Sequence, residues 1–140
     1  MIFDAKIDTW LIVLFIFATV ILLISPFIYH RKYKVSVIQS LFVLSLPVIF
    51  ALSLMWLPIF NTKYAINNQF LNINNGFSTR KIPLSAIISV EKSHAWGSAP
   101  ALSLDRLKVS YKNPNGKRAD VLISPKAADK FIEQLTLAKK

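Results

Sequence analysis

The chain has 140 residues, 54% of them hydrophobic, and a formal net charge of +10. A chain of this length that also carries long apolar runs has room for one small soluble domain and not for two. It contains no cysteine, which excludes disulfide bonds, thiolate catalysis and metal sites with cysteine ligands.

Two long uncharged runs occupy the N-terminal part of the chain. We predict membrane-spanning helices at about residues 10–29 and 36–58, separated by the basic loop 30–34. Neither run contains Asp, Glu, Lys or Arg. As a helix, each rises about 30 Å, the thickness of the hydrocarbon core of a bilayer. We therefore expect residues 1–61 to form a transmembrane hairpin and residues 62–140 to form a separate domain.

The basic side chains around the hairpin predict its orientation. The short loop carries Arg31, Lys32 and Lys34, whereas Lys6 and Lys63 lie near the outer ends of the two spans. Positive charge in short loops favours the cytoplasmic side of a membrane. We expect a multi-pass protein of the cell membrane with this loop in the cytoplasm and the C-terminal domain on the extracytoplasmic face. Neither span holds the ionisable residues that a transport path needs.

Beyond the hairpin the pattern changes to short strands separated by turn residues. In the clearest strand, Leu104 to Lys112, the side chains of Leu107, Val109 and Tyr111 alternate with polar ones, which predicts one buried and one exposed face. We expect five or six antiparallel strands. The candidates are residues 64–66, 70–73, 80–84, 86–91, 104–112 and 118–124.

A C-terminal helix follows the strands. We predict Ser124 as its N-cap and Pro125 as its first helical residue, since proline at that position loses no hydrogen bond. An apolar stripe predicts that the helix packs on the sheet, which gives an α+β domain. The stripe consists of Ala128, Phe131, Ile132 and Leu135.

Several pieces of the domain resemble a known family. They are Thr62-Lys63-Tyr64, Lys81-Ile82-Pro83-Leu84, Pro100 to Leu107, and Ile123-Ser124-Pro125-Lys126. The chain resembles small bacterial membrane proteins in which a bacterial pleckstrin-homology-like (PH-like) domain follows two transmembrane spans. The resemblance implies a PH-like antiparallel β-barrel capped by the C-terminal helix, and it implies no enzymatic activity, cofactor or agreed ligand. Its motif residues here are Pro83, Pro100, Ser103, Asp105, Arg106, Ser124 and Pro125.

The charge of the domain indicates its partners. Residues 61–140 hold thirteen basic and five acidic side chains. A tethered basic domain attracts anionic headgroups, so we expect membrane lipid as partner, with a membrane protein as a further candidate. A solvated surface without a partner is the alternative. Nucleic acid is not expected, because the domain is tethered and shows no stripe of stacking aromatic residues. The candidate contacts are Arg106, Lys108, Lys112, Lys117 and Arg118.

Catalysis has little support in the sequence. His94 lies near Glu91, Ser93 and Ser98, but no nucleophile elbow accompanies them and a single histidine does not make a metal site. We predict no enzyme, cofactor or metal, and no particular oligomeric state is indicated. The favoured function is a membrane-anchored binding module. A small immunity or stress-accessory protein of the cell envelope is the first alternative, and a membrane-associated enzyme is the second.

Overall fold

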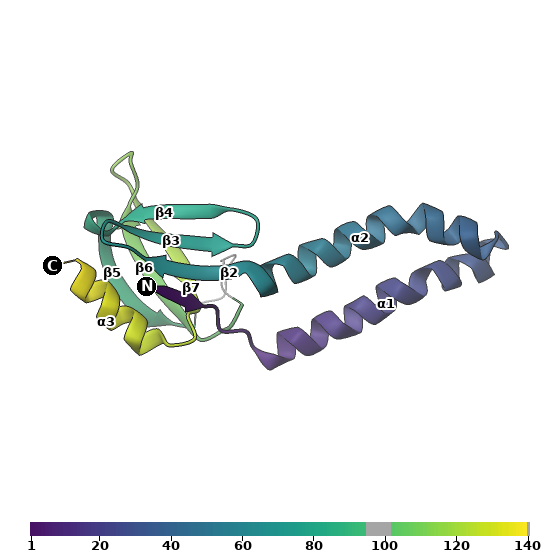
Figure 1. Ribbon diagram of the computed structural model, residues 1–140, viewed down its shortest axis with the longest axis horizontal. Coiled ribbons are helices and arrows are strands. Elements are labelled where there is room, and N and C mark those ends of the chain that lie inside the picture. The colour runs from purple at the N-terminus through teal and green to yellow at the C-terminus, as the bar shows by residue number, and fades with distance from the viewer. Residues whose placement is uncertain (95–101, 140) are drawn as a thin grey trace. The chain divides into compact units, whose positions relative to one another are not determined.

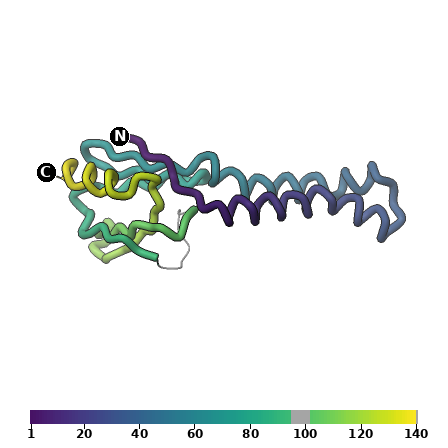
Figure 2. The backbone as a smooth tube through the Cα atoms, turned by 90° about the horizontal axis from the view of Figure 1, so that it is seen from below, coloured from purple at the N-terminus to yellow at the C-terminus, as the bar shows by residue number. Residues whose placement is uncertain are grey.

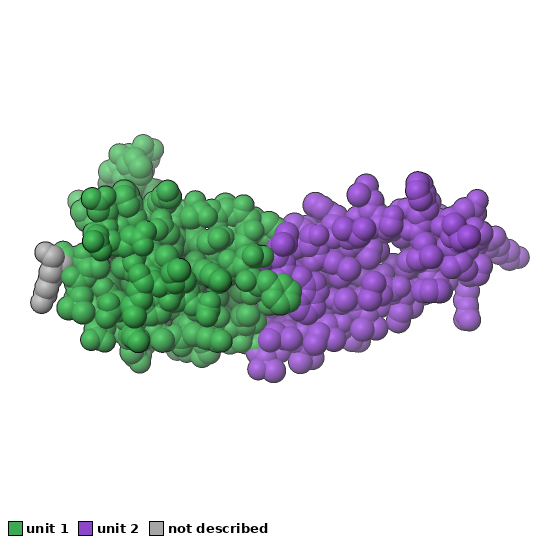
Figure 3. Space-filling view, in the orientation of Figure 1, with its two compact units in different colours: residues 1–8, 58–140 green, residues 9–57 purple. Residues whose placement is uncertain are grey.

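The structure is a computed structural model that describes residues 1–94 and 102–139 (Figure 1). The chain divides into two compact units. The first contains residues 1–8 and 58–140, and the second contains residues 9–57 (Figure 3). The first unit is therefore built from two segments that are separated in sequence by the whole second unit. The sequence pattern had grouped residues 1–8 with the hairpin.

The second unit is formed by helix α1 (Thr9–Tyr33) and most of helix α2 (Val37–Asn61). Both helices are long and apolar enough to cross a membrane. Helix α1 continues through most of the expected basic loop, because the cations Arg31 and Lys32 are favourable near the negative C-terminal end of a helix. It ends before Lys34, whose φ of 54° is left-handed.

The two helices of the hairpin are joined by side-chain contacts. The indole Nε1 of Trp56 donates a hydrogen bond of 3.0 Å to Thr19 Oγ1, and its ring meets Phe15 edge-on at 6.3 Å between centroids. At the start of α2, Ser36 and Gln39 bond each other's backbone N–H groups at 3.1 and 3.2 Å, which is a capping box. Most large apolar side chains of α1 and α2 are exposed on the outside of the pair.

Among the described residues of the first unit, seven strands form two antiparallel sheets, followed by one helix. The predicted architecture of two apolar helices, a β-domain and a C-terminal helix is confirmed, with seven strands where five or six were expected. The first sheet has the order β1 (Ile2–Asp4), β2 (Thr62–Ile66), β3 (Phe70–Asn75), β4 (Thr79–Pro83). After a short 3₁₀ helix, Leu84–Ala86, the second sheet has the order β5 (Ile87–Ser93), β6 (Arg106–Lys112), β7 (Arg118–Ile123).

Helix α3 (Ala128–Ala138) covers the core between the sheets. Its predicted apolar stripe is confirmed, since Phe131 and Leu135 are buried while Ala128 and Ile132 are partly buried. The Phe131 ring meets Tyr64 edge-on at 6.4 Å between centroids and Phe3 at 5.1 Å. The remaining fully buried apolar side chains are Leu71, Ile73, Ile82, Leu107, Val109 and Ile123.

Strand β1 was not expected from the sequence, and it joins the two sheets. On one edge it pairs with β2, with Phe3 opposite Tyr64. On the other side the chain meets the segment after β7: Lys6 N–H donates to Ser124 O at 2.6 Å, and Lys126 N–H donates to Asp4 O at 3.0 Å. Figure 2 shows α3 running alongside this N-terminal segment.

The predicted helix cap at Ser124 and Pro125 is wrong. Helix α3 begins at Ala128 and has no side-chain cap. Ser124 is instead fully buried: its N–H donates to the Tyr64 hydroxyl at 3.1 Å, and its Oγ accepts from Leu102 N–H at 3.1 Å. Buried polar groups need hydrogen-bond partners. Ser124 therefore pairs with Tyr64 and Leu102 inside the domain and does not cap the helix.

Candidate lipid-binding surface

The outer face of β6 and β7 carries the basic side chains that the sequence singled out. The inner face is as predicted, since Leu107, Val109 and Tyr111 are buried. The outer face is not a simple open stripe, because Ser110 is only 1% exposed. The register places Asp120 opposite Ser110. We call Arg106, Lys108, Lys112, Lys117 and Arg118 the β6–β7 basic surface.

Asp120 occupies the middle of this surface and partly neutralises it. Its carboxylate accepts a hydrogen bond of 2.7 Å from Ser110 Oγ and lies 3.0 Å from Lys108 Nζ. Arg118 Nε is 3.8 Å from the same carboxylate, and Arg118 also donates to Ser110 Oγ at 3.1 Å. The Ser110 hydrogen bond, followed by the Lys108 charge, lowers the pKa of Asp120 below its ordinary value of 3.8. Two cations thus share one anion, so the cluster remains positive.

Lys112 and Lys117 flank the turn between β6 and β7. The turn is closed by hydrogen bonds from Asn113 N–H to Lys117 O and from Gly116 N–H to Asn113 O, both 2.8 Å. Gly116 has a φ of 74°, a conformation that favours glycine. Both lysines are exposed, and within the described residues neither forms an ion pair with a carboxylate. They are the two cations of the surface that are most available to an anion.

Asp8 is held by the loop that precedes β6. Its carboxylate accepts hydrogen bonds from Ser103 Oγ at 2.6 Å and from Leu104 N–H at 2.8 Å. Its own N–H donates to Leu102 O at 3.1 Å. We call this contact between Asp8 and residues 102–104 the N-terminal clasp. It ties the last residue before α1 to the domain.

Asp105 and Arg106 have structural partners next to the clasp. The Asp105 carboxylate lies 2.8 Å from Lys6 Nζ, and this hydrogen bond and charge lower the pKa of Asp105 below its ordinary value of 3.8. Arg106 Nε donates to Ser103 O at 2.7 Å. Arg106 is therefore partly engaged by the backbone, and it begins the strand that reaches Lys112 at its other end.

Among the described residues, the other sequence candidates are not brought together. Pro83 ends β4 and is exposed, while Pro100 and Ser98 lie outside the described residues. His94 Nδ1 lies 3.3 Å from Leu104 O, a backbone contact. Within residues 1–94 and 102–139, no three His, Cys, Asp or Glu side chains are grouped so that they could hold a metal ion.

Sequence reasoning missed the parts that Lys6 and Asp8 play. Lys6 was counted only as a charge near the first span and Asp8 was given no role, yet their partners lie more than ninety positions away. No local pattern marks such a pairing, because it depends on the N-terminal segment returning to the sheet. The short apolar pair Ile2-Phe3 was the one available signal of a strand, with Phe3 7% exposed in the fold.

Two antiparallel sheets of four and three strands, covered by one C-terminal helix, agree with the architecture expected of a PH-like domain. A comparison with family models agrees: the model described as bacterial PH domain matches residues 62–139, more than half of the chain. The chain belongs to this family. The match begins with β2, so β1 and the two long helices lie outside it. Neither a search of curated proteins nor a search of solved structures found a match.

Proposed function

We propose that this chain is a membrane-anchored binding module whose PH-like domain docks on the anionic headgroups of the bilayer that holds its helices. One observation carries the proposal: two apolar helices are inserted between strands β1 and β2 of a basic domain. Family membership supports a binding role, because PH-like domains are generally non-catalytic binding modules. In this proposal residues 9–57 are the anchor, and residues 1–8 with 58–140 are the docking domain.

The dimensions of the helices support the anchor. Each has 25 residues and is therefore about 37 Å long, enough to cross a hydrocarbon core of about 30 Å with some tilt. The charged side chains of α1 are confined to its last turn, from which long side chains reach the headgroups. Water would leave the apolar outer faces of both helices exposed, whereas lipid covers them.

The chain leaves no linker between anchor and domain. Asp8, held in the N-terminal clasp, is followed directly by α1, and β2 begins at Thr62 directly after the last residue of α2. An anchored domain is then kept close to the bilayer surface. The potential of anionic headgroups is felt over about 8 to 10 Å at physiological salt, so those cations of the domain that face the bilayer surface interact with it.

The β6–β7 basic surface is our candidate for the docking contact. Lys112 and Lys117 have no carboxylate partner among the described residues, and Lys108 and Arg118 share only Asp120. Each well-placed cation contributes about 1 kcal/mol near an anionic surface. Two unpaired lysines therefore supply roughly a tenfold or larger preference for the docked state at low salt.

The absence of cysteine allows a direct test on the full chain. We would replace Asn115, at the tip of the β6–β7 turn, by cysteine, label it with the fluorophore NBD, and reconstitute the protein in vesicles. With phosphatidylcholine alone the label should report water. With added phosphatidylglycerol its emission should shift to the blue, and salt should reverse the shift because it screens the charges.

Two double variants complete this test. Lys112→Gln with Lys117→Gln should shift the ratio of docked to undocked protein about tenfold or more, because it removes the two unpaired cations. Lys126→Gln with Lys130→Gln removes two exposed cations elsewhere and should have a much smaller effect. Equal signals in neutral and anionic vesicles would refute lipid docking. A response seen only in native membranes would refute it in favour of a partner membrane protein.

A further inference from the structure

We propose that the turn between β3 and β4, residues 74–79, inserts Phe77 into the interfacial layer of the bilayer. The domain would then make an apolar contact with lipid in addition to its two spanning helices. This inference rests on the membrane anchoring proposed above. Three features carry it: the exposure of Phe77, the position of the turn in the fold, and the cations around it.

Phe77 is exposed by a turn that its own asparagines hold in place. Asn75 Oδ1 accepts hydrogen bonds from Phe77 N–H at 3.1 Å and from Ser78 N–H at 2.8 Å. Asn74 Oδ1 accepts from Gly76 N–H at 2.9 Å, and Gly76 has a φ of 88°. Phe77 is 54% exposed, and its neighbours in the turn are all polar or glycine. An aromatic ring presented in this way is available to an apolar partner from outside the domain.

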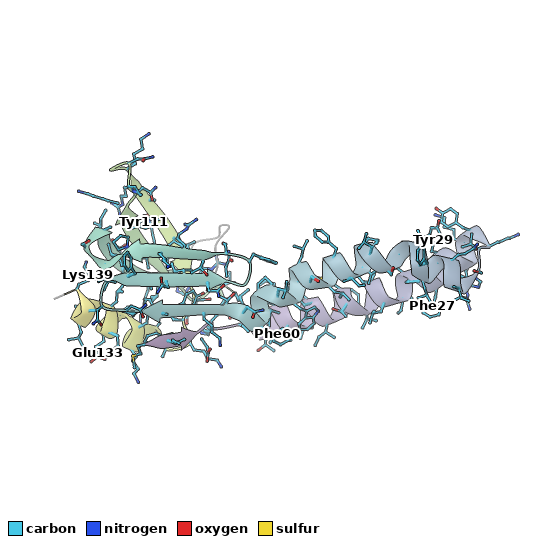
Figure 4. The ribbon with its side chains drawn as sticks, turned by 45° about the horizontal axis from the view of Figure 1, so that its top comes forward. Phe27, Tyr29, Phe60, Tyr111, Glu133 and Lys139 are labelled. Carbon is cyan, nitrogen blue, oxygen red and sulfur yellow. The ribbon has the colours of Figure 1, made fainter. Side chains whose placement is uncertain are left out.

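The turn lies at the end of the sheet where α2 enters the domain. Asn75 is paired with Thr62, which follows Asn61, the last residue of α2. Phe77 is two residues beyond this pair, so at about 3.3 Å per residue and about 4.8 Å between strands it lies within roughly 10 Å of the end of α2. Phe60, in the last turn of α2, is itself 69% exposed (Figure 4). An anchored α2 therefore brings the turn to the headgroup level.

Cations surround the turn. Lys63 lies on β2 beside Thr62, and Arg80 and Lys81 lie on β4 directly after the turn. All three are exposed, and within the described residues none forms an ion pair with a carboxylate. Arg80 donates to the Tyr111 hydroxyl at 3.4 Å. An aromatic ring with cations beside it suits the interface of an anionic membrane, where rings lie at headgroup depth.

Leu137 provides a matched comparison on the same domain. It is 54% exposed, as Phe77 is, and it lies near the end of α3. The next residue, Ala138, lines a surface pocket with Asn68 and Phe70, which are at the opposite end of β3 from Asn75. Leu137 is thus an equally exposed apolar side chain at the end of the sheet away from α2.

The test uses the full chain with a single cysteine at either position. Phe77→Cys and Leu137→Cys are labelled with NBD and reconstituted in phosphatidylcholine vesicles with or without brominated acyl chains. The label at position 77 should emit further to the blue, should be quenched by the brominated chains several-fold more than the label at 137, and should be protected from dithionite. Equal quenching and equal protection at the two positions would overturn the inference.

A second variant removes the effect of the label itself. The reporter is moved to Thr79→Cys, and Phe77 is either kept or replaced by serine. Loss of quenching with Phe77→Ser is expected, and unchanged quenching would also overturn the inference.

Extraction with alkaline carbonate separates the two proposals. If the protein resists extraction but position 77 stays in water, the insertion of Phe77 fails alone. If carbonate releases the protein, the proposed anchoring fails as well.

Discussion

At the scale of single residues, Asp8 ties the N-terminal segment to the loop that precedes β6. Three hydrogen bonds join it to one loop, and two of them end on its carboxylate. Removal of the carboxylate leaves the hydroxyl proton of Ser103, which is 2% exposed, and the Leu104 N–H without this acceptor, while Ser103 Oγ still accepts from Asp105 N–H. Such groups cost more when they are left unpaired than the bond contributes when it is made.

We expect Asp8→Ala to lower the free energy of unfolding of the domain by about 2 to 3 kcal/mol. The measurement is the thermal or urea midpoint of the full chain in detergent, followed by near-ultraviolet circular dichroism of the domain. Asp4→Ala is the matched control, because Asp4 is an exposed aspartate of the same segment whose backbone, not its carboxylate, bonds Lys126. If both variants unfold at the same midpoint, the clasp contributes nothing.

The residues whose positions were predictable are those that depend on their neighbours in sequence. The alternation of Leu107, Val109 and Tyr111 was correct, because a strand turns successive side chains to opposite faces whatever it packs against. Ser124 was misjudged although its local pattern is that of a helix cap. Its actual partners include Tyr64, sixty positions away, and that proximity exists only in the folded chain.

At the scale of elements, β1 shows how three residues complete the four-stranded sheet. The strand contributes Phe3, 7% exposed, to the ring cluster with Phe131, and it covers the free edge of β2. So short a strand has no periodicity to predict it, and its pairing partner follows only after the whole hairpin. The strands β2 to β7 and helix α3 were predictable to within a few residues, because each carries its own pattern and is bounded by turn residues.

We expect the domain to need β1 for its stability. A variant in which residues 1–8 are joined to residues 58–140 through a flexible linker of about eight residues should fold, since such a linker has a mean reach of about 16 Å. Residues 58–140 alone should be at least about 3 kcal/mol less stable, because loss of a buried phenylalanine alone costs about that much. Urea unfolding of the two soluble variants measures the difference. Equal stability would mean that β1 does not contribute to the stability of the domain.

At the scale of the whole molecule, the insertion of the helices into the domain decides how the chain is organised. A helical hairpin returns the chain to the side where it started, so residues 1–8 and 58–140 can meet in one domain. Hydropathy is a local property, and it predicted the two long apolar helices. The division of the domain into residues 1–8 and 58–140 was not predictable, because it depends on a long-range strand pairing. The family match, which begins at β2, does not include that pairing either.

The last prediction concerns the side of the membrane on which the domain lies. Arg31, Lys32 and Lys34 are at the far end of the hairpin from the domain in sequence, and cations near short loops favour the cytoplasm. We expect the loop to be cytoplasmic and the PH-like domain to be extracytoplasmic. In intact cells a membrane-impermeant maleimide should label Asn115→Cys and spare Val35→Cys, and lysis should expose both. The opposite labelling would reverse the orientation and would give the β6–β7 basic surface access to the lipids of the cytoplasmic leaflet. Replacement of the three loop cations by glutamine should increase the inverted fraction, because it removes the charge asymmetry that sets the orientation.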